Sequence, residues 1–362
     1  MKTSVTRIYQ VITLILSLIG VEQTLANPQD IGTVEERLKA LESNSSSLFS
    51  VDNFEFAALI EIEGSYTDTE DLFAATENNN AASDLVVATV ELRVDVEIND
   101  AVSASVVTLY EEDETDPMNI DVAVIEFDLG AGLSLKLGQD YIHFGAYETQ
   151  LVNDTLVLEL AEDPESIAVI SYEWSLLTAS AFVFNGDIDD NNNDLENYGL
   201  SVFIANETFT AGVDYQSNVA DTETLTDLAI NASTDFEDLP DAFIVYAMVD
   251  FENVVLIAEY FKASEFNAID FITVAGNAYE PEAIQLEAGI NIGDWTLAAA
   301  FQATDGAAAL LPEQRISVGG GTDIYENVTL TFEYWLDEDY DISEGGSGED
   351  ANNFVAQIAV TF

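Results

Sequence analysis

The sequence predicts an all-β protein: a transmembrane antiparallel β-barrel of about 16 strands, preceded by a short N-terminal helix. Three observations support this fold class. Apolar and polar residues alternate with a period of two from Phe54 to Phe362, short and long connections alternate between the predicted strands, and the chain is both acidic and apolar. Strong acidity alone would indicate disorder, but 48% of the residues are hydrophobic, as expected for strands with one apolar face and one wet face.

The composition of the 362 residues excludes several classes of function. The formal net charge of −61 argues against a nucleic-acid partner, because binding phosphates requires clustered Lys and Arg. The absence of cysteine excludes a disulfide framework, a thiol nucleophile and a Cys-ligated metal. His143 is the single histidine, and the sequence places no Ser or Asp partner beside it. We therefore expect no enzyme activity and no cofactor.

The N-terminus predicts export. Lys2 and Arg7 precede an apolar stretch at residues 8–19, and Thr24 and Ala26 then place small side chains at the −3 and −1 positions of a cleavage site. Residues 1–26 are therefore predicted to be a signal peptide. The apolar stretch is too short to span a bilayer as a helix, and an uncleaved anchor is the alternative.

Residues 27–50 are predicted to form a short periplasmic amphipathic helix and a linker. The apolar residues of this segment fall on the a and d positions of a heptad: Ile31, Val34, Leu38 and Leu41. The repeat covers less than two heptads, so association of the helix in a homotrimer and a lone helix at the barrel mouth are both compatible with it.

Residues 51–362 are predicted to form an outer-membrane β-barrel. The expected strands are residues 58–66, 86–98, 102–110, 123–129, 133–137, 168–174, 177–183, 198–204, 209–215, 243–251, 254–260, 284–292, 295–303, 316–320, 328–336 and 354–362. Short and long connections alternate between them, as periplasmic turns and external loops do in outer-membrane barrels. A soluble β-sandwich is the alternative, but it would not need aromatic residues at the strand ends.

Aromatic residues near the predicted strand ends favour insertion into a membrane, where they would form girdles at both interfaces. The candidates are Tyr66, Tyr110, Tyr141, Trp174, Tyr215, Tyr246, Tyr260, Trp295, Tyr334 and Trp335. The last strand ends in Phe362, which matches the barrel-assembly signal of outer-membrane proteins. We therefore expect the outer membrane of a Gram-negative bacterium as the location, with lipid, lipopolysaccharide and the barrel-assembly machinery as partners.

A closed barrel of this size predicts a pore. Sixteen strands enclose an aqueous lumen that side chains alone do not fill unless a loop folds in. Most of the inward positions are acidic, and the pore-lining candidates are Glu61, Glu91, Arg93, Asp95, Glu126, Lys136, Glu259, Glu287 and Glu333. A negatively charged lumen favours cations. The alternative is that the acidic residues only solvate the wall and the loops, or reflect a saline habitat.

The long connection at residues 144–165 is a candidate constriction loop. If it folds into the barrel, it brings four side chains near the narrowest point: Tyr147, Glu148, Asp154 and Glu159. An ordinary external loop is the alternative.

A second long connection resembles a calcium-binding loop because oxygen-bearing residues alternate in it, at Asp187, Asp189, Asn191 and Asn193. It is not an EF-hand, since Asn192 and Tyr198 replace the required Gly and Glu. A loose Ca²⁺ or Mg²⁺ site and a solvated loop are the alternatives. The acidic runs at residues 111–116 and 337–341 could likewise either bind Ca²⁺ or Mg²⁺ or form solvated loops.

Several segments, taken in order, resemble the LbtU family of siderophore porins: VEERLKALES at 34–43, DLVVATVELRVDVEINDAVSASVVTLYEED at 84–113, HFGAYET at 143–149, DTLVLELAED at 154–163, FVFNGD at 182–187, EYWLDEDY at 333–340 and GGSGEDA at 345–351. The ordered set carries the resemblance. It implies an outer-membrane barrel with a short periplasmic segment that takes up a ferric siderophore.

These observations together predict a passive outer-membrane porin that admits small solutes and, by the resemblance, a ferric siderophore through an acidic, water-filled lumen. A general cation-preferring porin is one alternative. A structural or binding barrel with little flux is the other.

Overall fold

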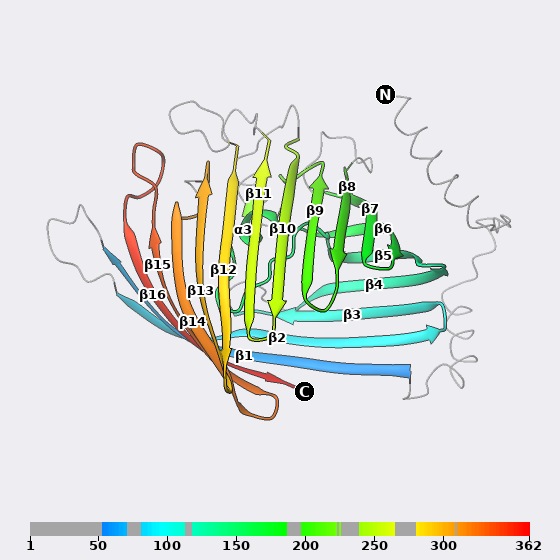
Figure 1. Ribbon diagram of the computed structural model, residues 1–362, viewed down its shortest axis with the longest axis horizontal. Helices are drawn as coiled ribbons and strands as arrows, with labels where there is room; N and C mark the ends of the chain where they lie inside the picture. The colour runs from blue at the N-terminus through cyan, green and yellow to red at the C-terminus, as the bar shows by residue number, and fades with distance from the viewer. Residues whose placement is uncertain are drawn as a thin grey trace.

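The computed structural model describes residues 53–70, 81–112, 118–186, 197–222, 224–225, 239–264, 280–307 and 310–362. These residues form a closed barrel of 16 antiparallel strands, each paired with its neighbours in sequence order (Figure 1). Pairing of β1 (Phe54–Glu70) with β16 (Asp350–Thr361) closes the barrel. The predicted barrel is confirmed, while the predicted signal peptide and helix at residues 1–50 lie outside the described residues.

The strands between these two follow the chain in order. They are β2 (Ala82–Asn99), β3 (Val102–Tyr110), β4 (Asn119–Gly130), β5 (Leu133–Tyr141), β6 (Pro164–Trp174), β7 (Leu177–Asn185), β8 (Asn197–Ala205), β9 (Phe209–Gln216), β10 (Ala242–Phe251), β11 (Val254–Ala263), β12 (Glu282–Ile292), β13 (Trp295–Asp305), β14 (Gln314–Tyr325) and β15 (Val328–Glu338).

Tight turns join the strands where the sequence predicts them. The first residue of β7 pairs with the last residue of β6, and β10 and β11 pair in the same way. Ser175 and Glu252 in these two turns have φ values of 59° and 55°. Short hairpin turns require such left-handed residues because their twist then matches the twist of the strands.

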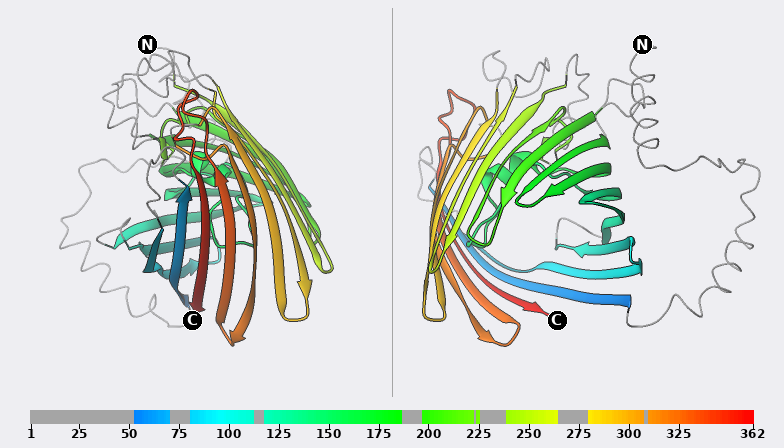
Figure 2. Two further views of the ribbon diagram at one scale, coloured as in Figure 1. Left: turned by 90° about the vertical axis from the view of Figure 1, so that its left-hand side faces the viewer. Right: turned by 45° about the vertical axis from the view of Figure 1, so that its right-hand side comes forward.

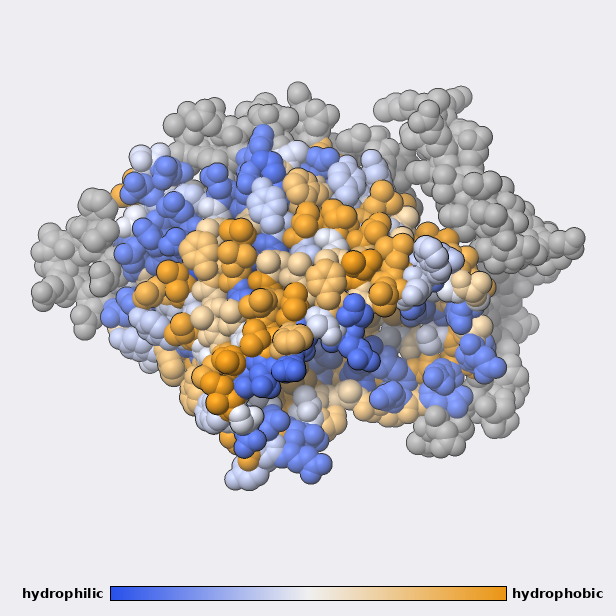
Figure 3. Space-filling view, viewed as in Figure 1, coloured by the Kyte–Doolittle hydropathy of each residue, from blue (hydrophilic) through white to orange (hydrophobic). Residues whose placement is uncertain are grey.

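The two faces of the sheet differ in chemistry because successive side chains of a strand point to opposite sides. On β12, Gln285 and Glu287 point inward and are buried, whereas Leu286 and Ile290 point outward and are 46% and 44% exposed. Hydrophobic residues gather across the middle of the outer face, and hydrophilic residues gather toward its edges (Figure 3). A lipid-facing surface has this distribution.

Two of the aromatic residues predicted to lie in the girdles instead point into the barrel. Tyr246 is buried and its ring lies against Gly212. Trp335 pairs in register with the buried residues Ser317 and Asn353, and its indole N–H donates to Asp337. Their positions near strand ends suggested a girdle, but the alternation along each strand places them on the inner face.

One short helix, α3 (Leu156–Ala161), interrupts the run of strands. Thr155 caps its N-terminus, where the Thr155 hydroxyl accepts a 3.0 Å hydrogen bond from the amide of Leu158. The helix buries Leu156, Val157, Leu160 and Ala161. Among the described residues, no helix is long and apolar enough to cross a membrane.

Candidate functional site

The segment between β5 and β6, residues 142–163, folds into the barrel, and we call it the inner loop. Its ends are held together because the amide of Ile142 donates a 2.9 Å hydrogen bond to the carbonyl oxygen of Asp163. Helix α3 lies in this loop and contacts β11, β12 and β13. In Figure 1 the helix is seen behind these strands, and in Figure 2 it is enclosed by the curved wall.

Wall carboxylates hold the inner loop by its backbone. Glu259 of β11 accepts hydrogen bonds of 2.7 and 3.0 Å from the amides of Ala146 and Tyr147. Glu333 of β15 accepts bonds of 2.8 and 2.7 Å from the amides of Val152 and Asn153. A loop without regular structure leaves its N–H groups unpaired, and charged acceptors satisfy them with stronger bonds than neutral ones.

Three further wall side chains extend this row. Glu287 of β12 accepts 2.7 Å bonds from the amide of Gln150 and the hydroxyl of Thr149. Asp214 of β9 accepts a 2.9 Å bond from the amide of Gly145. The side-chain oxygen of Gln302 on β13 accepts a 2.6 Å bond from the amide of Leu156, at the start of α3. The loop is therefore attached along most of its length.

Small residues on the inner face make room for the loop. Ala298, Ala300 and Ser317 are buried small residues of β13 and β14, in the part of the wall where Gln302 and Glu333 hold the loop. At Gly319 a Cβ would lie 2.5 Å from the backbone oxygen of Phe332 on β15 and 2.7 Å from Cδ2 of Leu151 in the loop. Gly145 combines a φ of 113° with close approach, since a Cβ would lie 2.9 Å from a carboxylate oxygen of Glu259. The seating of the loop therefore requires glycine at position 145, whereas at position 319 the backbone of β15 and the loop together leave no room for a side chain.

An apolar core fixes the loop against the wall at the ends of β6 to β12. Phe144 and Leu160 of the loop belong to one buried cluster with Phe184, Ile244 and Phe261 of the wall. The rings of Phe144 and Phe261 meet edge to face with centroids 6.2 Å apart. Burying each such side chain contributes roughly 1.5–3 kcal/mol of stability. The packed side chains of this cluster fill this part of the barrel, so it is not open.

The four predicted constriction-loop residues all belong to the inner loop. Glu148 and Asp154 are exposed, while Tyr147 and Glu159 are half-buried. The Tyr147 hydroxyl donates to the carbonyl oxygen of Phe144 within the loop. The carbonyl oxygen of Asp154 accepts a 3.3 Å bond from Arg315 of β14.

The nine predicted pore-lining residues divide into two groups. Glu259, Glu287 and Glu333 face the interior, but they are only 2%, 4% and 1% exposed because the inner loop covers them. The other six lie on β1, β2, β4 and β5, on the wall that the loop leaves open: Glu61, Glu91, Arg93, Asp95, Glu126 and Lys136. The alternation in the sequence predicts that each of these residues faces the interior of the barrel. It does not predict which half of the barrel the loop occupies.

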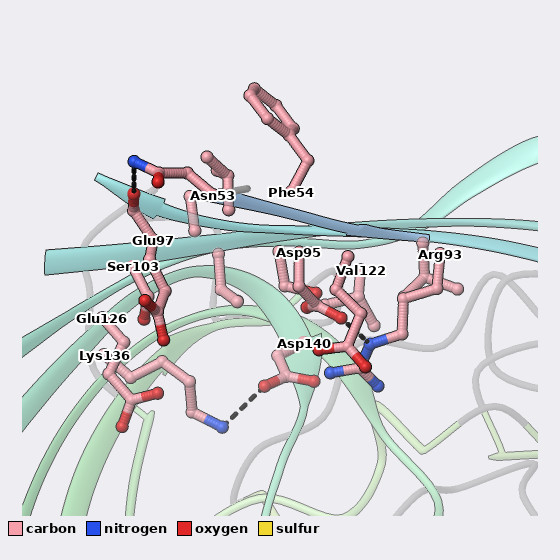
Figure 4. A pocket seen from close by; sticks show the side chains of 16 residues that line it. Asn53, Phe54, Arg93, Asp95, Glu97, Ser103, Val122, Glu126, Lys136 and Asp140 are labelled. Atoms are coloured by element: carbon pink, nitrogen blue, oxygen red, sulfur yellow. Dashed lines mark hydrogen bonds and ion pairs between the residues drawn. The ribbon is translucent and has the colours of Figure 1, made fainter. Parts of the chain in front are cut away.

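The open wall borders two cavities of about 680 and 710 Å³, and Figure 4 shows the first of them. They share Glu97, Ser103, Glu126 and Lys136, so they form one continuous space along the inner face of β2 to β5. The acidic residues that line this space are Glu55, Asp95, Glu97, Asp100, Glu126, Asp128, Asp140 and Glu173, and the basic residues are Arg93 and Lys136.

Both basic residues of the open wall are paired with carboxylates. Nε of Arg93 lies 2.7 Å from Asp95, and Nζ of Lys136 lies 2.6 Å from Asp140, as Figure 4 shows. The other described basic side chains are also paired, Lys262 with Glu280 and Glu282, and Arg315 with Asp337. Within the described residues, no Lys or Arg is left to offset the remaining carboxylates.

A further acidic grouping lies between the loop and the first two strands. Glu61 of β1 interacts electrostatically with Glu91 of β2 and with Asp154 of the inner loop. The loop therefore presents an exposed carboxylate toward a wall that already carries two.

Sequence reasoning did not select two residues of this site, Asp140 and Gln302. Asp140 follows Lys136 by four positions on one strand, so strand periodicity places both on the same face. Gln302 is a polar residue at an inward position of a mostly apolar strand, and this pattern could have identified it. Neither position shows from sequence alone which partner it has.

No metal centre is present among the described residues in the form of three or more His, Cys, Asp or Glu side chains. The predicted calcium-type residues Asp187, Asp189, Asn191 and Asn193 lie outside the described part of the chain.

Comparison with known proteins supports the fold. The outer-membrane channel DcaP of Acinetobacter baumannii aligns with a TM-score of 0.62 at 11% identity, over 85% of this chain and 97% of that one. A Salmonella typhi OmpF complex with daunomycin gives 0.59 at 14% identity, over 86% and 98%. The trimer form of OmpT, an outer-membrane protein of Vibrio cholerae, gives 0.53 at 12% identity, over 86% and 100%.

These likenesses establish that the chain has the fold of outer-membrane porins and channels. No protein-family model matches the sequence. No curated protein matches it either. The resemblance to LbtU siderophore porins is thus not confirmed.

Proposed function

We propose that the protein is a cation-preferring porin of the outer membrane. The observation that carries the proposal is the continuous acidic space along β2 to β5, bordered by eight carboxylates and by two basic residues that are both ion-paired. A lumen with low-dielectric walls and one dominant sign of charge concentrates ions of the opposite sign.

The inner loop sets the cross-section of this channel in our proposal. It fills the half of the barrel that β8 to β15 enclose and leaves the half along β1 to β5 open. Glu61, Glu91 and Asp154 form the acidic constriction through which solutes pass. Passive diffusion through a fixed channel requires no catalytic residues, so we propose no enzyme activity.

The proposed partners follow from the surface and from the fold. The outward apolar face fits outer-membrane lipid and lipopolysaccharide, and the terminal Phe362 fits recognition by the barrel-assembly machinery. A homotrimer is proposed because the OmpT structure that shares this fold is described in a trimer form.

Uptake of a ferric siderophore is the finer proposal that the sequence resemblance adds. The acidic lumen favours a complex that carries net positive charge or none, because like charge repels carboxylate-rich siderophores. A structural barrel with little flux is the competing account, which the open cavity disfavours.

Planar-bilayer recording of the refolded mature chain tests the function. Stable conductance steps support a channel, and steps that a neutral or cationic ferric siderophore blocks at low concentration support the finer proposal. Steps without any block remove the siderophore from the proposal. A correctly folded barrel without conductance overturns the porin function.

A further inference from the structure

Arg315 of β14 connects the wall of the barrel to the inner loop. Its Nη1 donates a 3.3 Å hydrogen bond to the backbone carbonyl oxygen of Asp154. The Arg315 side chain is only 11% exposed, and charged side chains are rarely covered to this extent unless they are paired. The contact with the loop therefore depends on the partners that hold the guanidinium in place.

Two side chains of β15 fix the guanidinium of Arg315. Asp337 lies directly across from Arg315 in the register and accepts a 2.7 Å bond from Nε and a 3.2 Å bond from Nη2. The indole N–H of Trp335 donates a 3.1 Å bond to the same carboxylate, and the centroid of its ring lies 5.8 Å from Cζ of Arg315. The bidentate pair occupies Nε and Nη2, so Nη1 remains for the loop.

Neighbouring bonds hold the loop backbone on both sides of Asp154. Glu333 accepts hydrogen bonds from the amides of residues 152 and 153. Gln302 accepts one from the amide of residue 156. Asp154 is exposed in the middle of this attached stretch. The wall thus fixes the backbone at Asp154 and leaves its carboxylate at the surface of the lumen.

The carboxylate of Asp154 belongs to the acidic grouping at the first two strands. It interacts electrostatically with Glu61 of β1, which also interacts with Glu91 of β2. Like charges repel one another, so a loop that could move would carry Asp154 away from this wall. A fixed backbone keeps the three carboxylates close together in spite of their repulsion.

We infer that Arg315 is a positioning residue for the acidic constriction, which acts on passing ions through Asp154 and not through its own charge. The inference rests on the proposed porin function, because it concerns the constriction of that channel. Asp337 neutralises the charge of Arg315, whereas the bond to the loop keeps a carboxylate in the path of the ions. A basic residue thereby supports the preference of the channel for cations.

The test is a double-mutant cycle on the K⁺/Cl⁻ permeability ratio of the refolded barrel in planar bilayers. Asp154→Asn should lower this ratio roughly twofold or more, because it removes one of the three interacting carboxylates. Arg315→Lys keeps the net charge but loses the planar fork that bonds Asp337 twice and still reaches the loop. In the Arg315→Lys background, Asp154→Asn should therefore have less than about half of its effect in the parent.

Two comparisons separate positioning from charge and from general stability. Arg315→Lys alone should lower the permeability ratio although the net charge of the chain is unchanged. Lys262→Arg is the matched control, since it is an equally conservative exchange at the ion pair between β11 and β12. In the Lys262→Arg background, Asp154→Asn should keep its full effect.

Equal effects of Asp154→Asn in the parent and in the Arg315→Lys background overturn the inference, and so does a parent channel that does not respond to Asp154→Asn. Cation-selective steps in either case leave the porin function standing, whereas a folded parent barrel without conductance overturns that function as well. If Arg315→Lys fails to fold, Asp337→Asn takes its place, because it weakens the bidentate pair. A reduced effect of Asp154→Asn in that background supports the inference, and a full effect contradicts it.

Discussion

Glu259 accepts a 2.7 Å hydrogen bond from the amide of Ala146, a residue 113 positions earlier in the chain. The bond crosses from the wall of the barrel to the loop folded within it. Glu287 and Glu333 repeat this arrangement on β12 and β15. Acidic residues of the wall therefore occupy two separate environments, since some anchor the loop and others line the open cavity.

Removing one anchor should loosen the inner loop. Glu333→Ala leaves the amides of Val152 and Asn153 without their acceptor, and each buried donor left unpaired costs about 1–3 kcal/mol. We expect a lower unfolding temperature and larger or noisier conductance steps. Asp250→Asn, at an exposed site, is the control. Unchanged stability and unchanged steps in Glu333→Ala would show that the loop does not depend on this anchor.

A side chain at Gly319 should destabilise the barrel. Its Cβ would meet both the backbone oxygen of Phe332 on β15 and Leu151 of the loop, whereas at Gly64 the nearest atom to a new Cβ is 3.9 Å away. Gly319→Val should therefore cost about 1–3 kcal/mol through overpacking, and Gly64→Val should cost less. Urea unfolding of the two variants measures the difference. Equal midpoints for the two variants would contradict the close packing around Gly319 described here.

Charge on the open wall should set ion selectivity. Lys136→Gln removes a cation and frees Asp140 from its ion pair, so cation preference should rise. Glu126→Gln should lower it, because one carboxylate leaves the cavity lining. Reversal potentials in a KCl gradient measure both effects. Both should shrink between about 0.1 and 1 M salt, where the screening length falls from about 10 to 3 Å. Shifts of the opposite sign would contradict the assignment of this wall to the channel.

The outward apolar face should tolerate charge only near its edges. Leu286 lies outward within β12, whereas Leu176 lies in the turn between β6 and β7. Arginine on a lipid face costs about 2–4 kcal/mol at the bilayer midplane and about 0–1 kcal/mol near the interface. Leu286→Arg should thus reduce the free energy of folding into liposomes far more than Leu176→Arg. Equal costs would argue against this face being embedded in lipid.

The number and order of the strands could be predicted from the sequence because each strand alternates strictly and each tight turn has a recognisable composition. The predicted strand at 316–320 shows where this reasoning stops, since β14 runs from Gln314 to Tyr325. Residues 319–321 in the middle of this strand are all glycine, so they show no alternation of apolar and polar side chains. The long pairing of β14 with β13 and β15 extends the strand through it.

The site was only partly predictable. Alternation assigns Glu259, Glu287 and Glu333 to the inner face, but hydrogen bonds to a loop more than a hundred residues away are tertiary contacts that no local pattern encodes. The lining of the open wall was easier to predict, because a residue there needs only to face inward to line the cavity. The predicted residues that do so are Arg93, Asp95, Glu126 and Lys136. Helix α3 was not predicted, since a single turn and a half buried inside a barrel has no amphipathic period of useful length.

The reversal potential of the refolded barrel in a planar bilayer, under a tenfold KCl gradient, tests the central claim most directly. An acidic lumen whose described basic residues are all ion-paired predicts a reversal potential with the sign of the K⁺ equilibrium potential. The magnitude should fall when both solutions are made more concentrated. A potential of the Cl⁻ sign, or a potential of zero, would contradict the account.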